Sequence, residues 1–359
     1  MREGNTKLTR IFLIRHAEAE GNLYRFAHGQ SEGLITPRGY IQIEQLKDRF
    51  INEKIDAVYS SDLKRTQTTA TAITQPHNLP LNTTPKLREV AMGEWEETSW
   101  GDLEYHFPEM LVKFNLDPAN WIIEGNELYE DLIARVTAFI TEVAKLHNGE
   151  TIALITHGFA IRSFLCRLMG YSSAESKNLR YCDNTAVALL TFSDGNFEVE
   201  YYNDNSHLKK DESTLAQQKW WRNENMLATE NMRYQELDKI NDALILAQFQ
   251  DELGNLPSAE MAYMTFLGEK PTGLLGLGKA EGNIGEIKYL YLVPELRNLK
   301  FGVQLLGKAI TEYRKQKVEY LRIKVCKDTP IFRLCKKHGF EVIEEFGNDV
   351  VLERNIRNW

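Results

Sequence analysis

The stretch LIRHAEAEGN, residues 13–22, lies close to the N-terminus and carries the strongest indication of the fold. It continues an apolar run, Ile11–Ile14, which has the length and composition of a buried strand. The run ends abruptly in Arg15 and His16, and two acidic residues and a Gly-Asn pair follow. Parallel sheets bind ligands beyond the carboxyl ends of their strands, so this ending predicts a binding site at the edge of a sheet.

Strand and helix patterns alternate over the first two hundred residues. Strand-like runs occupy 11–16, 55–61, 151–158 and 184–192, and helical patterns occupy 36–53, 62–73 and 159–170. Thr36 and Pro37 supply an N-cap and a first helical residue for one of these helices. The alternation predicts a three-layer α/β/α domain with a mainly parallel sheet.

Composition restricts the class of protein. A chain of 359 residues exceeds what one core usually supports, and we expect two domains. Residues 1–229 hold 24 Lys+Arg against 32 Asp+Glu, and the remainder hold 19 of each, so the excess acid argues against a nucleic-acid-binding protein. No apolar run has the length of a membrane helix, and the four cysteines lack CxxC spacing. We therefore expect a cytoplasmic protein that contacts neither nucleic acid nor membrane.

The pattern changes in the second half. Residues 209–229 read as a connector, in which Trp220 and Trp221 are expected to pack between the domains. An amphipathic helix is predicted over 233–253. After it we expect strands at 262–267, 273–282, 285–293 and 318–325, helices at 301–316 and 330–339, and a closing strand pair at 340–346 and 348–356. The predicted domains are thus 1–208 and 230–359.

Several chemically active side chains follow the strands of the first domain: Arg15, His16 and Asn22 in one loop, Arg65, Glu89 and His157. Two arginines beside two histidines would form a cationic cluster suited to a dianionic phosphoryl group. A neutral imidazole can attack phosphorus if its other nitrogen donates to a partner such as a backbone carbonyl. A carboxylic acid can protonate the leaving oxygen, and this chemistry needs no metal ion.

The first part of the chain, about residues 8–208, resembles the histidine phosphatases, which include the cofactor-dependent phosphoglycerate mutases. The resemblance rests on ordered blocks that include LIRHAEAEGN, VYSSDLKRTQTTA, LREVAMGEWEE and ALITHGFAIRSFL. It implies that His16 is the phosphohistidine nucleophile and that Glu89 is the general acid and later the base for water. It also implies a phosphate site made by Arg15, Arg65, His157, Asn22 and Gly158. The usual glycine after Arg-His is Ala17 here.

The resemblance leaves two activities open for this domain. A mutase shields its phosphohistidine with a longer insertion than the Val90–Thr156 segment, so we expect a phosphatase of a small phosphomonoester without cofactor or metal. The alternative is a phosphoglycerate mutase-like phosphotransferase. The remaining histidines are expected to be structural or on the surface: His28, His77, His106, His147, His207 and His338.

Residues 230–359 resemble the GNAT acyltransferases. EIKYLYLVPELRNLKFGVQLLGKAI looks like the strand, turn and helix that bind acetyl-CoA, and 295–337 hold 12 Lys+Arg against 4 Asp+Glu. The resemblance implies an acetyl-CoA site at Leu292, Val293, Arg297, Asn298, Lys300, Phe301, Gly302 and Val303, with Glu286 as a base for an amine acceptor. Lys300 stands where the family has its first glycine, and Cys335 where a tyrosine often acts as acid. We expect an acetyl-CoA-dependent N-acetyltransferase, which Glu286 favours. Lys300 and Cys335 favour the alternative of a regulatory module that binds CoA without turnover.

Overall fold

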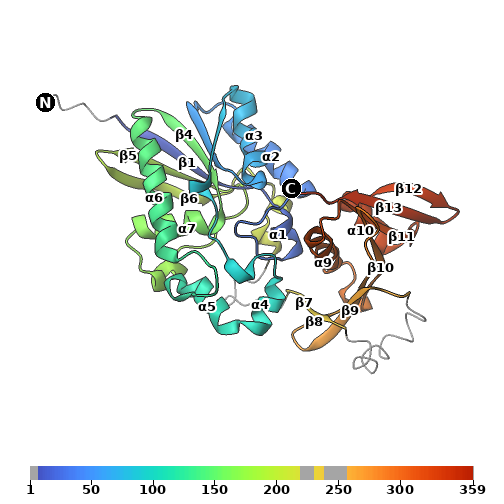
Figure 1. The fold of residues 1–359 in the computed structure, drawn as a ribbon. Coiled ribbons are helices and arrows are strands. Elements are labelled where there is room, and N and C mark those ends of the chain that lie inside the picture. The colour runs from blue at the N-terminus through green and yellow to red at the C-terminus, as the bar shows by residue number, and fades with distance from the viewer. Residues whose placement is uncertain (1–6, 219–229, 238–256, 359) are drawn as a thin grey trace. The chain divides into compact units, whose positions relative to one another are not determined.

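The computed structural model describes residues 7–218, 230–237 and 257–358 (Figure 1). The chain forms two compact units. The first comprises Met1–Asn22, Ala27–Thr98 and Phe107–Ala228, and the second comprises Leu23–Phe26, Ser99–His106 and Thr229–Trp359. Trp220, Trp221 and most of the predicted helix at 233–253 lie outside the described residues.

The first unit is built on a sheet with the strand order β3-β2-β4-β1-β5-β6 within the described residues. Its strands are β1 (Thr9–Arg15), β2 (Ala57–Ser61), β3 (Leu81–Thr84), β4 (Thr151–Thr156), β5 (Val187–Ser193) and β6 (Asn196–Asp204). The four strands from β3 to β1 run parallel, and β5 and β6 add antiparallel pairs at one side. The predicted mainly parallel α/β/α architecture is confirmed.

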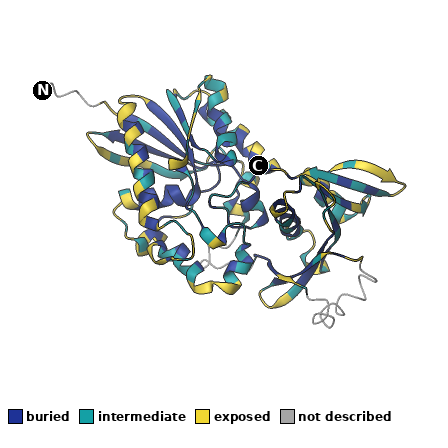
Figure 2. Cartoon of the chain, viewed as in Figure 1, coloured by how far each residue is buried: buried dark blue, intermediate teal, exposed yellow. Residues whose placement is uncertain are grey.

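Helices cover both faces of this sheet (Figure 1). The helices of the unit are α2 (Pro37–Phe50), α3 (Lys64–His77), α5 (Pro108–Leu116), α6 (Tyr129–Leu146) and α7 (Gly158–Leu168), and α1 (Glu20–Tyr24) begins in it. On one face, α2 and α3 pack Leu46 and Ile73 against Phe12 and Ile14. On the other face, α6 and α7 pack against β1. Every residue of β4 is buried, as Figure 2 shows for the centre of the sheet.

The second unit contains a sheet with the strand order β12-β13-β11-β10-β9-β8-β7 within the described residues. Its strands are β7 (Arg233–Glu236), β8 (Met261–Leu267), β9 (Lys270–Leu277), β10 (Ile284–Leu292), β11 (Tyr320–Cys326), β12 (Glu341–Phe346) and β13 (Asp349–Asn355). Its helices among the residues that the structure describes are α4 (Trp100–His106), α9 (Gly302–Lys315) and α10 (Pro330–Lys337). Only β10 and β11 pair in parallel among these described strands.

The start of the predicted helix at 233–253 is wrong. Residues Arg233–Glu236 form β7, which pairs antiparallel with β8. The Arg233 guanidinium lies 4.0 Å from the centre of the Phe266 ring and 4.1 Å from that of Tyr105. These partners are distant in sequence, so a tertiary contact overrides the helical periodicity here.

Two short segments of the first half complete the second unit. In α4, Asp102 accepts a hydrogen bond from the backbone N–H of Tyr234, at 2.8 Å. A Cβ at Gly307 of α9 would lie 2.3 Å from that of Tyr24, so this close approach requires glycine. The second unit therefore depends on residues that precede it by more than a hundred positions.

Candidate active site

The predicted nucleophile and the second histidine are brought together by strand register. Arg15 and Thr156 are partners in the parallel ladder of β1 and β4, so the residues that follow them, His16 and His157, leave the sheet side by side. Their ring centroids are 5.2 Å apart. The predicted edge of the sheet is therefore where these two imidazoles meet.

The ring of His16 is held in one orientation. Its Nδ1 lies 2.7 Å from the carbonyl oxygen of Ala17, which makes Nδ1 the protonated nitrogen and leaves the Nε2 lone pair available. Burial, followed by the charges of Arg65 and Arg15, holds the pKa of His16 well below its ordinary value. His16 is therefore a neutral imidazole at neutral pH, the form that can attack phosphorus.

His157 is the residue before α7 and is fully buried. Burial first, and then Arg65, His16 and Arg15, lower its pKa well below the ordinary value. Gly158 begins α7, and a Cβ there would lie 3.0 Å from Arg15 Nε. The glycine thus gives the Arg15 side chain room beside the helix N-terminus.

The two arginines are fixed by backbone carbonyls. Arg15 donates from Nη1 to Cys182 O at 2.6 Å. Arg65, in the first turn of α3, donates to Ser31 O at 2.8 Å and to Gly29 O at 2.6 Å. Arg65 is 1% exposed, and its positive charge is therefore poorly screened by water.

Asn22 is oriented by its neighbours. Its Oδ1 accepts hydrogen bonds from Ala19 N at 3.1 Å and from Asn184 Nδ2 at 3.3 Å. Because Oδ1 accepts these two hydrogen bonds, the Nδ2 group of Asn22 points away from Ala19 and Asn184. Its two N–H donors can therefore bind an anion.

Glu89 follows β3 and the 3₁₀ turn η1 (Pro85–Leu87). Its carboxylate accepts hydrogen bonds from Phe159 N at 3.0 Å and from Ala160 N at 2.9 Å, at the start of α7. Burial nevertheless raises the pKa of Glu89, against the opposing effect of these N–H groups and of Arg65. A carboxyl group with a raised pKa suits a proton donor.

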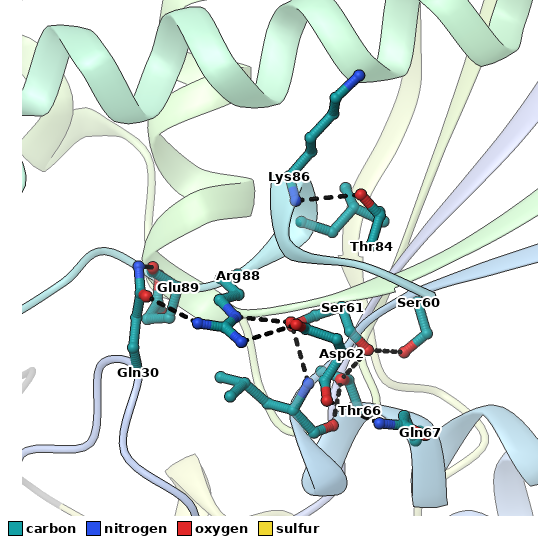
Figure 3. A network of polar contacts seen from close by, with 12 residues as sticks. Gln30, Ser60, Ser61, Asp62, Thr66, Gln67, Thr84, Lys86, Arg88 and Glu89 are labelled. Atoms are coloured by element: carbon teal, nitrogen blue, oxygen red, sulfur yellow. Dashed lines mark hydrogen bonds and ion pairs between the residues drawn. The ribbon is translucent and has the colours of Figure 1, made fainter. Parts of the chain in front are cut away.

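Side chains around Glu89 form a polar network that fixes the backbone at this residue (Figure 3). This network was not predicted from the sequence. Arg88 makes a two-point ion pair with Asp62, at 2.6 and 2.7 Å, and donates to Gln30 Oε1 at 3.3 Å. Gln30 in turn donates from Nε2 to Glu89 O at 3.2 Å. The available signal in the sequence was Asp62, which directly follows β2, whereas its partner Arg88 comes 26 positions later in the Leu-Arg-Glu block.

Several polar atoms in this cluster are buried without a hydrogen-bond partner among the described residues: Arg15 Nε, His157 Nδ1, His157 Nε2 and Asn184 Oδ1. Unmade hydrogen bonds of buried groups are costly, so their concentration around His16 indicates a place for a polar ligand. Within residues 7–218, 230–237 and 257–358, no group of three or more His, Cys, Asp or Glu is placed to hold a metal ion.

Comparison with known proteins agrees with this geometry. The sequence model of the histidine phosphatase superfamily (branch 1) matches residues 11–205. The chain belongs to the histidine phosphatase superfamily. The sequence model of the acetyltransferase (GNAT) family matches residues 217–340 of the same chain. Both predicted family memberships are confirmed.

Individual relatives match the first part of this chain. It is 27% identical over 205 residues to phosphoserine phosphatase 1 of Hydrogenobacter thermophilus, which covers 56% of this chain and 95% of that protein. It is 29% identical over 209 residues to a probable phosphoglycerate mutase GpmB of Enterobacter sp., with coverage of 56% and 95%. Its fold is similar to that of Bacillus stearothermophilus YhfR, with a TM-score of 0.54, 23% identity and coverage of 56% and 100%.

The predicted acetyl-CoA residues lie at the turn between β10 and α9. β10 pairs with β11 only from Ile284 to Ile287, although β10 continues to Leu292. Asn298 and Lys300 have φ of 62° and 70°, so the lysine adopts the left-handed conformation that favours glycine. The first turn of α9 has no side-chain cap, which leaves backbone N–H donors next to basic residues. The turn therefore fits a pyrophosphate group.

Glu286 and Cys335, the two residues of the second unit considered for proton transfer, differ in their exposure to solvent. Glu286 is on β10 with its carboxylate 2.5 Å from Lys288 Nζ, and its side chain is 44% exposed. Cys335 is fully buried in the core, and burial raises the pKa of its thiol to about 12. A thiol so placed is a poor replacement for a tyrosine acid. No helix among the described residues is long and apolar enough to cross a membrane.

Proposed function

We propose that the first unit is a metal-independent phosphomonoesterase that acts through a phosphohistidine at His16. The observation that carries the proposal is the oriented neutral imidazole of His16, with Nδ1 at 2.7 Å from Ala17 O, beside buried donors of Arg15 and His157 that have no partner among the described residues. An anion between these donors would satisfy them and would lie next to the nucleophilic nitrogen.

The proposed reaction has two steps. In the first, His16 Nε2 forms a bond to phosphorus while the bond to the leaving oxygen breaks, and the Glu89 carboxyl group gives its proton to that oxygen. In the second, the Glu89 carboxylate takes a proton from water as the water attacks phosphorus, which releases phosphate and restores neutral His16. Arg15, Arg65 and Asn22 stabilise the charge on the other phosphoryl oxygens in both steps.

The names of the relatives indicate which substrates to test first. One matched relative is a phosphoserine phosphatase, which makes phosphoserine the first natural substrate to test. Others carry the name phosphoglycerate mutase, and the mutase reaction remains the competing proposal. The two differ in whether water or a second hydroxyl receives the phosphoryl group.

The first experiment measures hydrolysis of p-nitrophenyl phosphate in the presence of a metal chelator, by wild type and by His16→Ala. We expect wild type to hydrolyse the ester equally well with and without the chelator. We expect no hydrolysis by His16→Ala. Chelator-sensitive turnover, or full activity of His16→Ala, would overturn it. A mutase would instead transfer label from phosphoglycerate to a second hydroxyl and release little free phosphate.

For the second unit we propose acetyl-CoA binding at the β10–α9 turn, with transfer of the acetyl group to an amine. The backbone N–H groups of Phe301, Gly302 and Val303, with Lys300, would hold the pyrophosphate. Acetyl-CoA supplies an activated thioester there. Glu286, which accepts a hydrogen bond from Lys288 Nζ, would accept the amine proton. Calorimetry with acetyl-CoA tests binding, and loss of acetylation without loss of binding in Glu286→Gln tests the base.

A further inference from the structure

The loop Cys182–Thr185, which precedes β5, directly contacts the loop Arg15–Asn22, which we call the catalytic loop. Asn184 Nδ2 donates to His16 O at 2.8 Å as well as to Asn22 Oδ1. Thr185 N donates to Arg15 O at 3.1 Å. The position of this loop therefore sets the backbone of the nucleophile and the orientation of the Asn22 amide.

Thr185 is in a strained conformation, with φ of 58°. A β-branched residue rarely adopts a positive φ, and such a conformation persists only where the surroundings impose it. One contact comes from His207, whose Nε2 lies 3.1 Å from Thr185 Oγ1. His207 lies beyond the histidine phosphatase match, which ends at residue 205.

Residues 206–216 lie between the two family matches, and we call them the 206–216 segment. This segment holds Asp183, which is 1% exposed. Ser213 Oγ donates to Asp183 Oδ2, and Leu215 N donates to Asp183 Oδ1 at 3.1 Å. Since Asp183 is adjacent to Asn184, these bonds fix the side of the catalytic loop that faces β5.

The same segment reaches the other side of the catalytic loop through Gln42 of α2. Gln42 Nε2 donates to Glu212 O at 2.7 Å and to Thr214 Oγ1 at 3.0 Å. Its Oε1 accepts from Glu18 N at 2.7 Å, two residues after His16. Gln42 is completely buried, so this chain of bonds is protected from competition with water.

We propose that the 206–216 segment is a positioning element of the phosphatase site, which holds the Arg15–Asn22 loop from both sides and so sets the geometry of His16 and Asn22. The inference rests on the proposed phosphatase function and extends it to residues that the superfamily match does not include. Ser213 and Thr214 act through other residues and are positioning residues.

The test compares Ser213→Ala, Thr214→Val and Ser213→Thr in the full chain. Three quantities are measured: kcat and KM for p-nitrophenyl phosphate, the Kd of inorganic phosphate by calorimetry, and the melting temperature. Ser172→Ala is the matched control, because Ser172 Oγ also donates to a carboxylate, that of Glu175, but in an exposed turn. All assays run well below the lowest melting temperature of the set.

A positioning role predicts a loss of about tenfold in kcat/KM and in phosphate affinity for Ser213→Ala and for Thr214→Val. Ser213→Thr keeps the hydroxyl and is expected to retain activity, and Ser172→Ala is expected to match wild type. Lower melting temperatures with unchanged kcat/KM and unchanged phosphate affinity would overturn the proposal and leave the phosphatase function standing.

The phosphate titration separates the two proposals. If wild type does not hydrolyse the ester but its phosphate affinity falls in Ser213→Ala and Thr214→Val, the phosphatase function fails and the positioning role stands. If wild type neither hydrolyses the ester nor binds phosphate, both proposals fail.

Discussion

The Nδ1 atom of His16 lies 2.7 Å from the carbonyl oxygen of Ala17, the next residue in the chain. This contact assigns the tautomer of the proposed nucleophile without a carboxylate partner. It involves only the backbone carbonyl of residue 17, so an alanine side chain at this position is compatible with the oriented ring.

The role of Glu89 predicts a dependence on the leaving group. Glu89→Gln keeps the size of the side chain but cannot donate a proton, so kcat/KM for phosphoserine, which reports the transfer to His16, is expected to fall by about 10²–10⁴-fold. The nitrophenolate anion is a good leaving group and needs less protonation, so kcat/KM for p-nitrophenyl phosphate should fall less. Steady-state kinetics measure both losses, and an equal loss of kcat/KM for the two esters would contradict a general-acid role.

The pH profile of kcat/KM follows from the free enzyme. His16 must be neutral, and burial keeps its pKa well below 6.5, so activity is expected to fall only when the pH drops through that lowered value. Glu89 must be protonated, and burial raises its pKa above 4.5, so activity is expected to fall as the pH rises through that raised value. Glu89→Gln should therefore lose the alkaline decline and keep the acid one. An alkaline decline that persists unchanged in Glu89→Gln would exclude Glu89 as its origin.

Arg65 is expected to be irreplaceable by lysine. Arg65 bonds Ser31 O from Nη1 and Gly29 O from Nη2, and a lysine ammonium has no planar fork that spreads its donors over separate nitrogens in this way. Arg65→Lys should lower kcat/KM by about 10²–10³-fold and weaken inhibition by phosphate. Arg167→Lys serves as the control, because Arg167 donates from Nη2 to both carboxylate oxygens of Glu130 at an exposed position. Comparable losses in the two variants would show that the effect is not specific to the site.

Substitutions at Lys300, in the turn before α9, are expected to change acetyl-CoA binding more than the free energy of unfolding. Lys300 and Lys317 both adopt a positive φ, 70° and 59°, but Lys317 follows the other end of α9. Glycine at either position relieves strain and adds unfolded-state entropy, so each free energy of unfolding should change by less than about 1 kcal/mol. Lys300→Gly alone should weaken acetyl-CoA binding, by about tenfold. Equal affinities of the two variants in calorimetry would remove Lys300 from the site.

The sequence predicted the parts of the site that strand register brings together. Parallel strands place the residues after Arg15 and Thr156 next to each other, so motifs at strand ends are informative about contacts across the sheet. The contribution of Ser213 and Thr214 could not be foreseen. Their partners, Asp183 and Gln42, are 30 and 172 positions away, and nothing in a short polar stretch signals such pairing.

The second unit shows the same limit. The strands and helices from Met261 onward follow the predicted order, because their apolar patterns are clear and several of them, such as β8, β9 and β12, are directly followed by a glycine. Arg233–Glu236 became a strand instead of a helix, since its neighbours β8 and Tyr105 come from distant parts of the chain. Local patterns cannot encode a partner of this kind.

A rapid acid-free quench of the first turnover, with an excess of ³²P-labelled phosphoserine or p-nitrophenyl phosphate over enzyme, tests directly for a phosphohistidine at His16. We expect a burst of leaving group equal to the enzyme concentration, and label that is acid-labile, alkali-stable and confined to the tryptic peptide beginning at His16. His16→Ala should show neither burst nor label. Label on another residue, or turnover by wild type in which no labelled enzyme forms at any time, would contradict a phosphohistidine at His16.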